Sequence, residues 1–314
     1  MAAVIPTLFF VSLVYWVDRY EKEPLWLLSA TFLWGAIPSI MAALLLNALL
    51  TAPPTLYGPH IGQMVGVTLI APVVEESLKG LAVLGILLLW RHEIDSLLDG
   101  IIYGAMVGFG FAMVENVFYF MSTYAESGQH AWEMSVLLRG IVFGLNHALY
   151  SSMIGLGVAV SRLSDRPAVK VSAPIIGWLA AVTVHLIHNL SASLGGLAVF
   201  VTLSNAWGGV LVVLIIIAWA LLQERRWIRH YLAEEVQFGT MTAEQYRNAF
   251  SSWRALAHRY HLLATEGYGA YSRATHFYRS CSELAYQKHH QDTSEPGQMD
   301  SMREKISTLS RRIN

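Results

Sequence analysis

Residues 61–90 read IGQMVGVTLIAPVVEESLKGLAVLGILLLW, an apolar run that carries Glu75, Glu76 and Lys79 near its middle. Each charged side chain at the centre of a membrane helix costs roughly 2.5–3.5 kcal/mol by insertion scales. Ionisable groups inside membrane segments are rare for this reason, and they mark functional sites. The stretch therefore predicts a membrane-spanning helix that contributes side chains to a site.

The whole chain has the composition of an integral membrane protein. Of its 314 residues, 54% are hydrophobic and 14% are charged, whereas soluble domains carry about 25% charged residues. The single cysteine, Cys281, excludes an intramolecular disulfide and a CxxC zinc site. The net charge of −1 gives no indication of nucleic-acid binding. We expect the lipid bilayer to be the surroundings of most of the chain and no nucleic-acid partner.

Seven apolar segments reach or nearly reach the ~20 residues needed to cross a bilayer as a helix. Among the connections between segments, Lys and Arg occur only in alternate ones, 18–25, 91–97 and 161–172, and they occur again after the last segment. The positive-inside rule then predicts an extracytoplasmic N-terminus and a cytoplasmic C-terminus. The fold class expected is an all-α polytopic membrane protein. The segments are about 1–17, 26–50, 62–90, 98–121, 135–160, 173–190 and 205–222.

The composition changes after the last apolar segment, which predicts three parts in the chain. Residues 1–222 form the transmembrane domain. Residues 223–290 form a helical cytoplasmic appendage, because Tyr246, Phe250 and Trp253 recur at helical spacing. Residues 291–314 begin within the polar stretch HHQDTSEPGQMD (289–300) and are expected to be a flexible tail.

Further polar residues lie in the predicted spans and fall on four consecutive helices, the third to the sixth. With a rise of 1.5 Å per residue, their depths overlap in the middle and outer part of the membrane. Four helices that place polar groups in one slab predict a single buried polar cavity. The residues are Glu75, Glu76, Lys79, Glu115, Asn116, Arg139, Asn146, His147, His185, His188 and Asn189.

Helical geometry constrains how these side chains are arranged. Glu75 and Glu76 are about 100° apart on a helix, so they cannot face the cavity equally. Lys79 is within reach of either, which predicts one carboxylate paired to Lys79 and the other facing water. His185 and Asn189 share a face at i, i+4. The simpler interpretation of His188 beside them is a hydrogen bond between helices.

The remaining cation in the spans is Arg139. It is expected to be structural, either as the counter-charge of Glu115 or of Glu133 or as a residue that snorkels to the membrane surface.

A carboxylate beside histidines and an amide, in a cavity that water can enter, suits hydrolysis. A glutamate can activate water as a general base, and side-chain donors can stabilise the oxyanion that forms. Alternatively, His147, His185 or His188 with Glu75 or Glu115 could hold Zn²⁺ in an open three-ligand site. If a metal is bound, the predicted ligands are Glu75, His147 and His185. HExxH is absent, so no local motif requires a metal. The G-x-S-x-G and paired-aspartate motifs are also absent, which argues against serine and aspartyl intramembrane proteases.

Four motifs in order resemble the PrsW family of intramembrane proteases, which is related to glutamate-dependent CAAX-processing and bacteriocin-immunity-type membrane peptidases. They are EESLK at 75–79, FAMVEN at 111–116, His147 on the next helix and HxxxN at 185–189. The segment WVDRYEKEP after the first span adds to the resemblance, which covers about residues 10–190.

The resemblance implies roles for these residues in an intramembrane endopeptidase. Glu75 would activate water, and its neighbour Glu76 would orient Glu75. His185 and Asn189 would be oxyanion donors. Glu115 and His147 would complete the site. One departure concerns Glu115, because it stands where the wider group has the histidine of an FxxxH motif. Lys79, Asn116 and His188 are the supporting residues.

The resemblance also implies a location, a substrate class and two mechanisms. The protein would be a multi-pass protein of a bacterial plasma membrane that cleaves a single-pass membrane protein, with an anti-sigma factor in stress signalling as the specific candidate. A Zn²⁺-dependent mechanism and a metal-free glutamate mechanism both fit the residues.

Two alternatives come from other classes of protein. Intramembrane Glu and His residues also mark proton- or ion-coupled transporters. Paired halves with broken helices, which many transporters show, are not apparent in the sequence. The other alternative is a scaffold or immunity protein without catalysis, which the presence of every motif position disfavours.

Overall fold

Helices are the only regular secondary structure in the computed structural model over the residues that it describes, 1–20, 22–55, 58–290 and 298–313, which confirms the predicted all-α class. The chain divides into two compact units. Unit 1 comprises Met1–Asp18 and Glu23–Ile217, and unit 2 comprises Arg19–Lys22 and Ala218–Asn314. Helix α9 (Ala198–Tyr231) contributes residues to both units.

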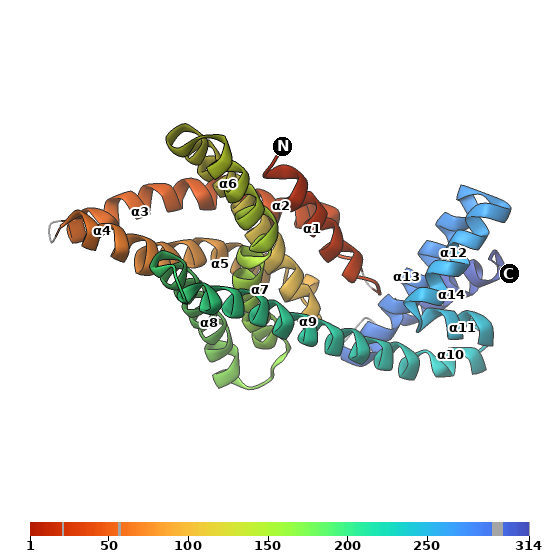
Figure 1. Ribbon diagram of the computed structural model, residues 1–314. Helices are drawn as coiled ribbons and strands as arrows, with labels where there is room; N and C mark the ends of the chain where they lie inside the picture. The colour runs from red at the N-terminus through yellow and green to blue at the C-terminus, as the bar shows by residue number, and fades with distance from the viewer. Residues whose placement is uncertain (21, 56–57, 291–297, 314) are drawn as a thin grey trace. The chain divides into compact units, whose positions relative to one another are not determined.

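Unit 1 holds the eight helices that precede α9, together with short π-helical and 3₁₀ segments (Figure 1). Three of these segments, η1, η2 and η4, are π-helical, a geometry that is rare and frequent at functional sites. In chain order the elements are α1 (Val4–Val17), α2 (Leu25–Trp34), η1 (Gly35–Ser39), α3 (Ile40–Thr55), α4 (Pro59–Val65), η2 (Gly66–Ile70), α5 (Ala71–Leu89), η3 (Arg91–Glu93), α6 (Leu97–Ser135), η4 (Val136–Val142), α7 (Asn146–Leu163) and α8 (Pro167–Leu194).

Over the described part of the chain, four helical stretches are long and apolar enough to cross a bilayer. They are Leu25–Pro53, Leu97–Leu163, Pro167–Leu194 and Ala198–Gln237. Helix α1 is apolar but has only 14 residues, and α5 carries the charged residues of the EESLK motif. The count of seven spans and the orientation of the termini stay predictions.

The long stretch Leu97–Leu163 folds back on itself. Gly128 within α6 has φ of +78°, a conformation that breaks the helix and that glycine adopts without strain. The two halves then pack backbone against backbone, because a Cβ built on the α6 glycines would lie 2.2–2.3 Å from carbonyl oxygens of α7. The three close pairs are Gly100 with Gly155, Gly104 with Ser151 and Gly108 with His147. Small residues at membrane helix contacts allow such close approach, and here they fix His147 against α6.

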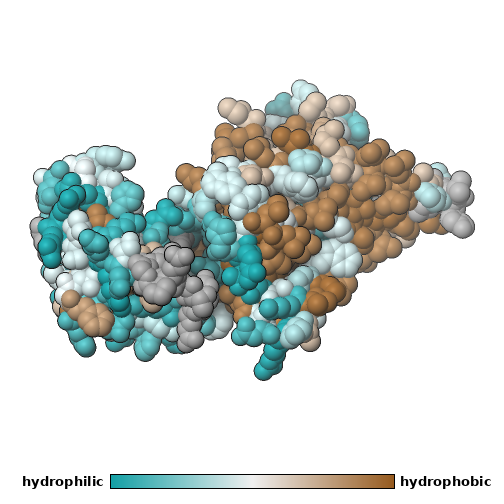
Figure 2. Space-filling model, turned by 180° about the vertical axis from the view of Figure 1, so that it is seen from behind, coloured by the Kyte–Doolittle hydropathy of each residue, from teal (hydrophilic) through white to brown (hydrophobic). Residues whose placement is uncertain are grey.

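The outer surface of unit 1 is apolar. Figure 2 shows hydrophobic residues, in brown, covering much of one face of its helices. Large side chains such as Leu45, Ile176 and Ile215 have 59–62% of their surface exposed. Apolar side chains exposed around a helical bundle are what a lipid-facing surface requires.

Unit 2 is a small helical domain with its own core. Its helices after α9 are α10 (Ala233–Gln237), α11 (Ala243–Ala249), α12 (Ser252–Glu266), α13 (Tyr268–His290) and α14 (Gln298–Arg311). Helices α12 and α13 pack as a hairpin that turns at Gly267, whose φ is +84°. Phe277, Cys281 and Leu284 of α13 are fully buried in the core.

The segment after α13 differs from the flexible tail expected for 291–314. Gln298–Arg311 is helical because Met302, Ile306 and Leu309 recur at helical spacing and pack on the core of unit 2, with Ile306 fully buried. Residues 291–297 and 314, where flexibility was also expected, lie outside the described residues.

Unit 2 includes a short piece from the beginning of the chain. The Tyr20 hydroxyl donates a hydrogen bond to the carbonyl oxygen of Phe250 at 3.5 Å, across 230 residues of sequence. The guanidinium of Arg19 lies 5.4 Å from the ring centroid of Trp253. Unit 2 is therefore discontinuous in sequence.

Candidate active site

The polar residues predicted for the spans of unit 1 surround one cavity of about 670 Å³. Helices α3 to α8 and the segments η2 and η4 contribute to its wall. Of the predicted site residues, Glu75, Glu115, Asn116, His147, His185, His188 and Asn189 line the cavity. Glu76 and Lys79 lie behind this wall, and both are fully buried.

The two adjacent glutamates of α5 have different surroundings. Glu76 Oε1 accepts hydrogen bonds from Lys79 Nζ at 2.6 Å and from His185 Nδ1 at 2.8 Å. Glu75 lines the cavity with 5% of its surface exposed, and its Oε2 has no hydrogen-bond partner among the residues that the structure describes. The structure thus has the expected division, one carboxylate paired to Lys79 and the other facing the cavity.

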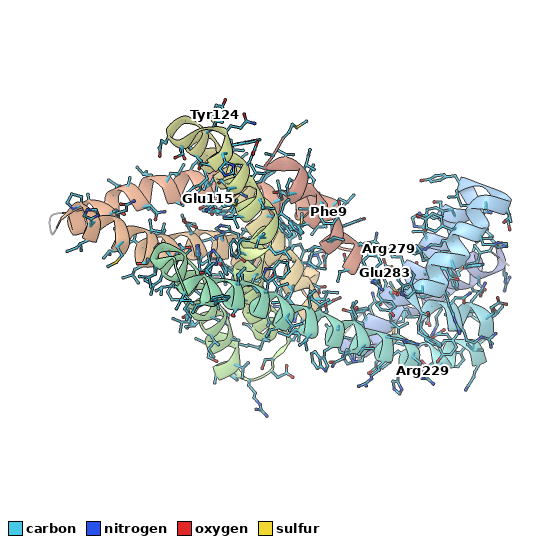
Figure 3. All side chains as sticks on the ribbon, in the orientation of Figure 1. Phe9, Glu115, Tyr124, Arg229, Arg279 and Glu283 are labelled. Atoms are coloured by element: carbon cyan, nitrogen blue, oxygen red, sulfur yellow. The ribbon has the colours of Figure 1, made fainter. Side chains whose placement is uncertain are left out.

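A chain of hydrogen bonds links α6, η4 and α7 beside Glu75. Arg139 Nη2 donates to Glu115 Oε2 at 2.6 Å, and Arg139 Nε donates to Asn116 Oδ1 at 3.0 Å. His147 Nε2 lies 3.0 Å from the same Glu115 oxygen. Glu115 lies on α6 between neighbouring helices, whereas Tyr124 lies near the far end of that helix (Figure 3). Glu115 is one of the two partners predicted for Arg139, and that pairing is confirmed.

Lys79 determines which ring nitrogen of His147 carries the proton. Its Nζ lies 3.1 Å from His147 Nδ1 and 4.4 Å from the ring centroid of Phe111. An ammonium can only donate hydrogen bonds, so Nδ1 accepts from Lys79, and the proton of a neutral His147 is on Nε2, where it is donated to Glu115. The same reasoning places the proton of His185 on Nδ1, facing the Glu76 carboxylate.

Two residues of α8 that line the cavity also bond to other protein groups. Asn189 Nδ2 donates to the carbonyl oxygen of Val67 in η2 at 2.9 Å. In a π-helix the carbonyl of Val67 would accept from residue 72, and Pro72 has no N–H, so Asn189 supplies the missing donor. His188 lies 3.2 Å from Asn146 Nδ2 on α7, the interhelical hydrogen bond that its simpler interpretation predicts.

The comparison with known families agrees with these motifs. Residues 23–222 match the family described as PrsW family intramembrane metalloprotease. The chain belongs to the PrsW family. The predicted resemblance is therefore confirmed, and membership of this family does not favour the transporter alternative.

Individual relatives are similar over part of the chain. The protein named Protease PrsW from Clostridioides difficile (strain 630) is 30% identical over 155 residues, 49% of this chain and 62% of the relative. The Geobacillus kaustophilus (strain HTA426) protein of the same name is 29% identical over 155 residues, again 49% of this chain and 62% of the relative. The Bacillus subtilis (strain 168) protein is 27% identical over 54% of this chain and 72% of the relative. The chain thus spans about three fifths of the length of the first two relatives. No solved structure matches the chain.

Family membership and the apolar helices together make the chain a multi-pass protein of the bacterial plasma membrane.

One cluster in the described residues has the donors of a metal site, as the family description requires. Glu75, His147 and His185 each present one ligand atom, and these three atoms lie within 4.8 Å of one another. A carboxylate with two imidazoles is a donor set of catalytic zinc sites. Glu76 on His185 and Glu115 on His147 are the outer carboxylates that commonly orient metal-binding imidazoles.

The contact between Lys79 and His147 limits the binding of a metal ion at this cluster. Both ring nitrogens of His147 are already engaged, Nδ1 by Lys79 and Nε2 by Glu115. Glu75 Oε2 and His185 Nε2 are the ligand atoms that remain available to a metal ion. The cluster therefore fits a divalent ion provided that Lys79 gives up its contact with His147.

Two cavity residues with an unpartnered polar atom in the described ranges, Asn47 and Tyr150, were not predicted from the sequence. Asn47 of α3 lines the cavity with an amide oxygen that has no partner in the described ranges. A polar residue inside an apolar span is a signal that could have found it. Tyr150, one helical turn beyond His147, also lines the cavity. Its signal is weak, because a tyrosine in a membrane helix usually packs as an apolar side chain.

Proposed function

We propose that this chain is an intramembrane endopeptidase that hydrolyses a peptide bond of a single-pass membrane protein. The observation that carries the proposal is Glu75, a buried carboxylate in a cavity within apolar helices, beside His147 and His185. Its neighbour Glu76 is neutralised by Lys79, whereas the Oε2 of Glu75 is left without a partner in the part of the chain described. A carboxylate kept in this way is suited to accept a proton from water.

In the proposed reaction Glu75 acts first as a base and then as an acid. The Glu75 carboxylate takes one proton from water while the water oxygen forms a bond to the carbonyl carbon of the substrate. The C–O double bond becomes a single bond to an oxyanion. When the C–N bond then breaks, the nitrogen takes the proton from Glu75, and the carbonyl re-forms as a carboxylic acid. The carboxylate is regenerated at the end of the cycle.

The other polar residues position this reaction. Glu76 accepts from His185 Nδ1 and holds the ring in one tautomer. Glu115 is itself held by Arg139 and fixes His147 from the other side of the cavity. Asn189, which has one amide N–H left, keeps the role of oxyanion donor that the family resemblance implies, whereas His185 can take that role only with a proton on Nε2. Asn116 and His188 support the wall.

If a metal takes part, Glu75, His147 and His185 would hold it. A bound Zn²⁺ would supply Lewis-acid polarisation of the peptide carbonyl and a more acidic water. Metal content per chain, measured on protein purified without chelator, tests this version directly. About one zinc ion per wild-type chain, lost in His185→Ala, supports it, whereas full cleavage by metal-free protein supports the glutamate mechanism.

The cavity also has polar groups for a substrate chain. Beyond Glu75 its wall includes Asn47 and Thr51 of α3 and Gln63 of α4. Such groups can satisfy the backbone of an unwound segment, which must find hydrogen-bond partners inside a membrane. The finer proposal, that the substrate is an anti-sigma factor, is supported by the resemblance to the family.

The test compares the newly formed protein termini in host membranes that contain wild-type or Glu75→Gln protein. We expect at least one single-pass protein to be cleaved only with the wild type. That protein, reconstituted in lipid vesicles with the purified full chain, should then be cleaved by the wild type at a rate that falls at least 100-fold in Glu75→Gln.

Glu133→Gln is the matched control, since Glu133 is an exposed carboxylate that bonds to Gln129 and does not line the cavity. It should cleave like the wild type. The proposal fails if no terminus depends on Glu75, or if Glu75→Gln cleaves at the wild-type rate.

A further inference from the structure

Tyr150 of α7 is a buried tyrosine whose hydroxyl is unused. Only 1% of its surface is exposed, and its hydroxyl has no hydrogen-bond partner among residues 1–20, 22–55, 58–290 and 298–313. The residue lines the same cavity as Glu75. A buried hydroxyl without a hydrogen-bond partner costs free energy of folding. We therefore expect the Tyr150 hydroxyl to find its partner in a bound substrate.

The ring of Tyr150 is fixed by the two histidines of the site. It stacks on His185 with centroids 4.6 Å apart and an interplanar angle of 18°. It also meets His147 edge to face, at 5.9 Å and 69°. Because the ring is held on two sides, the hydroxyl is positioned before any substrate arrives, as electrostatic stabilisation of a transition state requires.

The other candidate oxyanion donors are largely committed. Neutral His185 donates its Nδ1 proton to Glu76, which leaves Nε2 as an acceptor. His147 donates Nε2–H to Glu115. Asn189 has given an N–H to Val67 and has one left. The Tyr150 hydroxyl is a donor with no such commitment.

We propose that Tyr150 is a further catalytic residue, whose hydroxyl donates a hydrogen bond to the oxyanion of the tetrahedral intermediate. This inference rests on the proposed peptidase function. During attack by water, the carbonyl oxygen gains the negative charge, and the phenolic O–H donates to it without transferring its proton. When the C–N bond breaks, the hydrogen bond weakens, and the hydroxyl returns to its resting state.

The test is the variant Tyr150→Phe, assayed on the single-pass protein found by the comparison of termini. The variant keeps the ring that stacks on His185 and removes only the hydroxyl. We expect kcat to fall about 10²–10³-fold, the effect of losing one oxyanion donor, with KM changed less than about twofold. Thermal unfolding should start no earlier than in the wild type, because the removed group had no partner.

The matched control is Tyr124→Phe, a tyrosine of α6 that is 60% exposed and does not line the cavity. Its kcat should equal that of the wild type. A purely structural hydroxyl would give the opposite pattern, with lower stability and unchanged kcat in the folded fraction of Tyr150→Phe.

The outcomes separate this inference from the function on which it rests. A slow, stable Tyr150→Phe supports the inference. If Tyr150→Phe retains the wild-type kcat while Glu75→Gln is inactive, the role of Tyr150 is overturned and the peptidase stands. If the wild type leaves every single-pass protein intact, both are overturned.

Discussion

Lys79 Nζ lies 2.6 Å from Glu76 Oε1, and neither side chain has any exposed surface. The ammonium also contacts Nδ1 of His147, so a single cation serves both a carboxylate on its own helix and an imidazole on α7. Removing one partner of a buried ion pair leaves an uncompensated charge, which costs far more than losing an exposed pair. The pair therefore contributes to stability and to the position of His147.

We predict that Lys79→Met lowers the free energy of unfolding by about 3–5 kcal/mol, because Glu76 would be left as a buried, unpaired anion. Unfolding in mixed micelles measures this loss. The double variant Lys79→Met with Glu76→Gln should recover part of it, which gives the coupling energy of the pair. Lys170→Met, at an exposed lysine, is the control. A Lys79→Met protein as stable as this control would contradict the prediction.

A second prediction concerns the close contact of α6 and α7. A Cβ at Gly104 would lie 2.3 Å from the Ser151 carbonyl oxygen, so Gly104→Ala must push the helices apart. We expect it to destabilise unit 1 by about 1–3 kcal/mol, as overpacking usually does. Gly85→Ala is the matched control, because a Cβ at Gly85 meets nothing within 4 Å. Its stability should be unchanged or higher by up to about 1 kcal/mol. Equal stabilities of the two variants would refute the contact.

The third prediction is a pH dependence from Glu23, which lies between α1 and α2. Burial, and then the negative charge of Asp99, raise the pKa of Glu23 well above its usual range, and Asp18 adds to the effect. The Tyr103 hydroxyl donates to Glu23 Oε2. In the unfolded chain the pKa is about 4.3. A raised folded pKa gives stability that is complete below the unfolded value and is lost as pH rises toward the folded value.

We therefore expect the unfolding temperature of the wild type to fall as pH rises from 5 to 8. Glu23→Gln, which stays neutral, should show a shallower decline and be more stable than the wild type at pH 8. Glu126→Gln, at an exposed carboxylate, should follow the wild type. Parallel curves for wild type and Glu23→Gln would rule out the shift.

The fourth prediction tests Asn47 as a contact for substrate. Asn47 lines the cavity, and its buried amide oxygen has no partner in the described part of the chain, so we expect it to accept a backbone N–H of the substrate. Loss of one such bond, worth about 0.5–1.5 kcal/mol, should raise KM roughly 2- to 12-fold in Asn47→Ala with kcat unchanged. Leu45→Ala on the same helix, 62% exposed and outside the cavity, should leave KM as it is. An unchanged KM in both variants would remove Asn47 from the binding surface.

The fifth prediction concerns Cys281, the one cysteine of the chain. Its side chain is fully buried in unit 2, and burial raises the pKa of its thiol, so little reactive thiolate forms. We expect no labelling by a maleimide in the native protein and one label per chain after denaturation. Ser301→Cys places a thiol at an exposed position and should be labelled at once. Rapid labelling of the native wild type would show that the core of unit 2 opens.

Much of the site could be predicted because charge in hydrocarbon is so costly. Glu75, Lys79 and His147 stand out in apolar segments for that reason, and helical spacing alone limits Lys79 to one of two carboxylates. Lys79 pairs with the carboxylate of Glu76, which also bonds to His185. His185 lies 109 residues from Glu76 in the sequence, and no local pattern predicts that its side chain points to Glu76. The same applies to Tyr150, since an unused hydroxyl is visible only once all neighbours are in place.

The parts that were not predicted depend on backbone geometry. The π-helical turn before Pro72 leaves the Val67 carbonyl without a backbone donor, and Asn189 donates one N–H to it. The family resemblance implies only the other role of Asn189, as an oxyanion donor. Part of the segment expected to be flexible forms α14, because Ile306 packs in a core with residues of α13. A search for local disorder signals does not detect such a tertiary contact. In both cases a tertiary contact overrides a local pattern.

The discontinuity of unit 2 affects how the protein is made. Tyr20 leaves the ribosome 230 residues before its partner Phe250. At ~5–20 residues per second, roughly 10–50 s of translation separate the two. During that interval Tyr20, in the loop after α1, lacks its contact with Phe250. Unit 2 thus reaches its final form only after α14 has been synthesised, because α14 packs on its core.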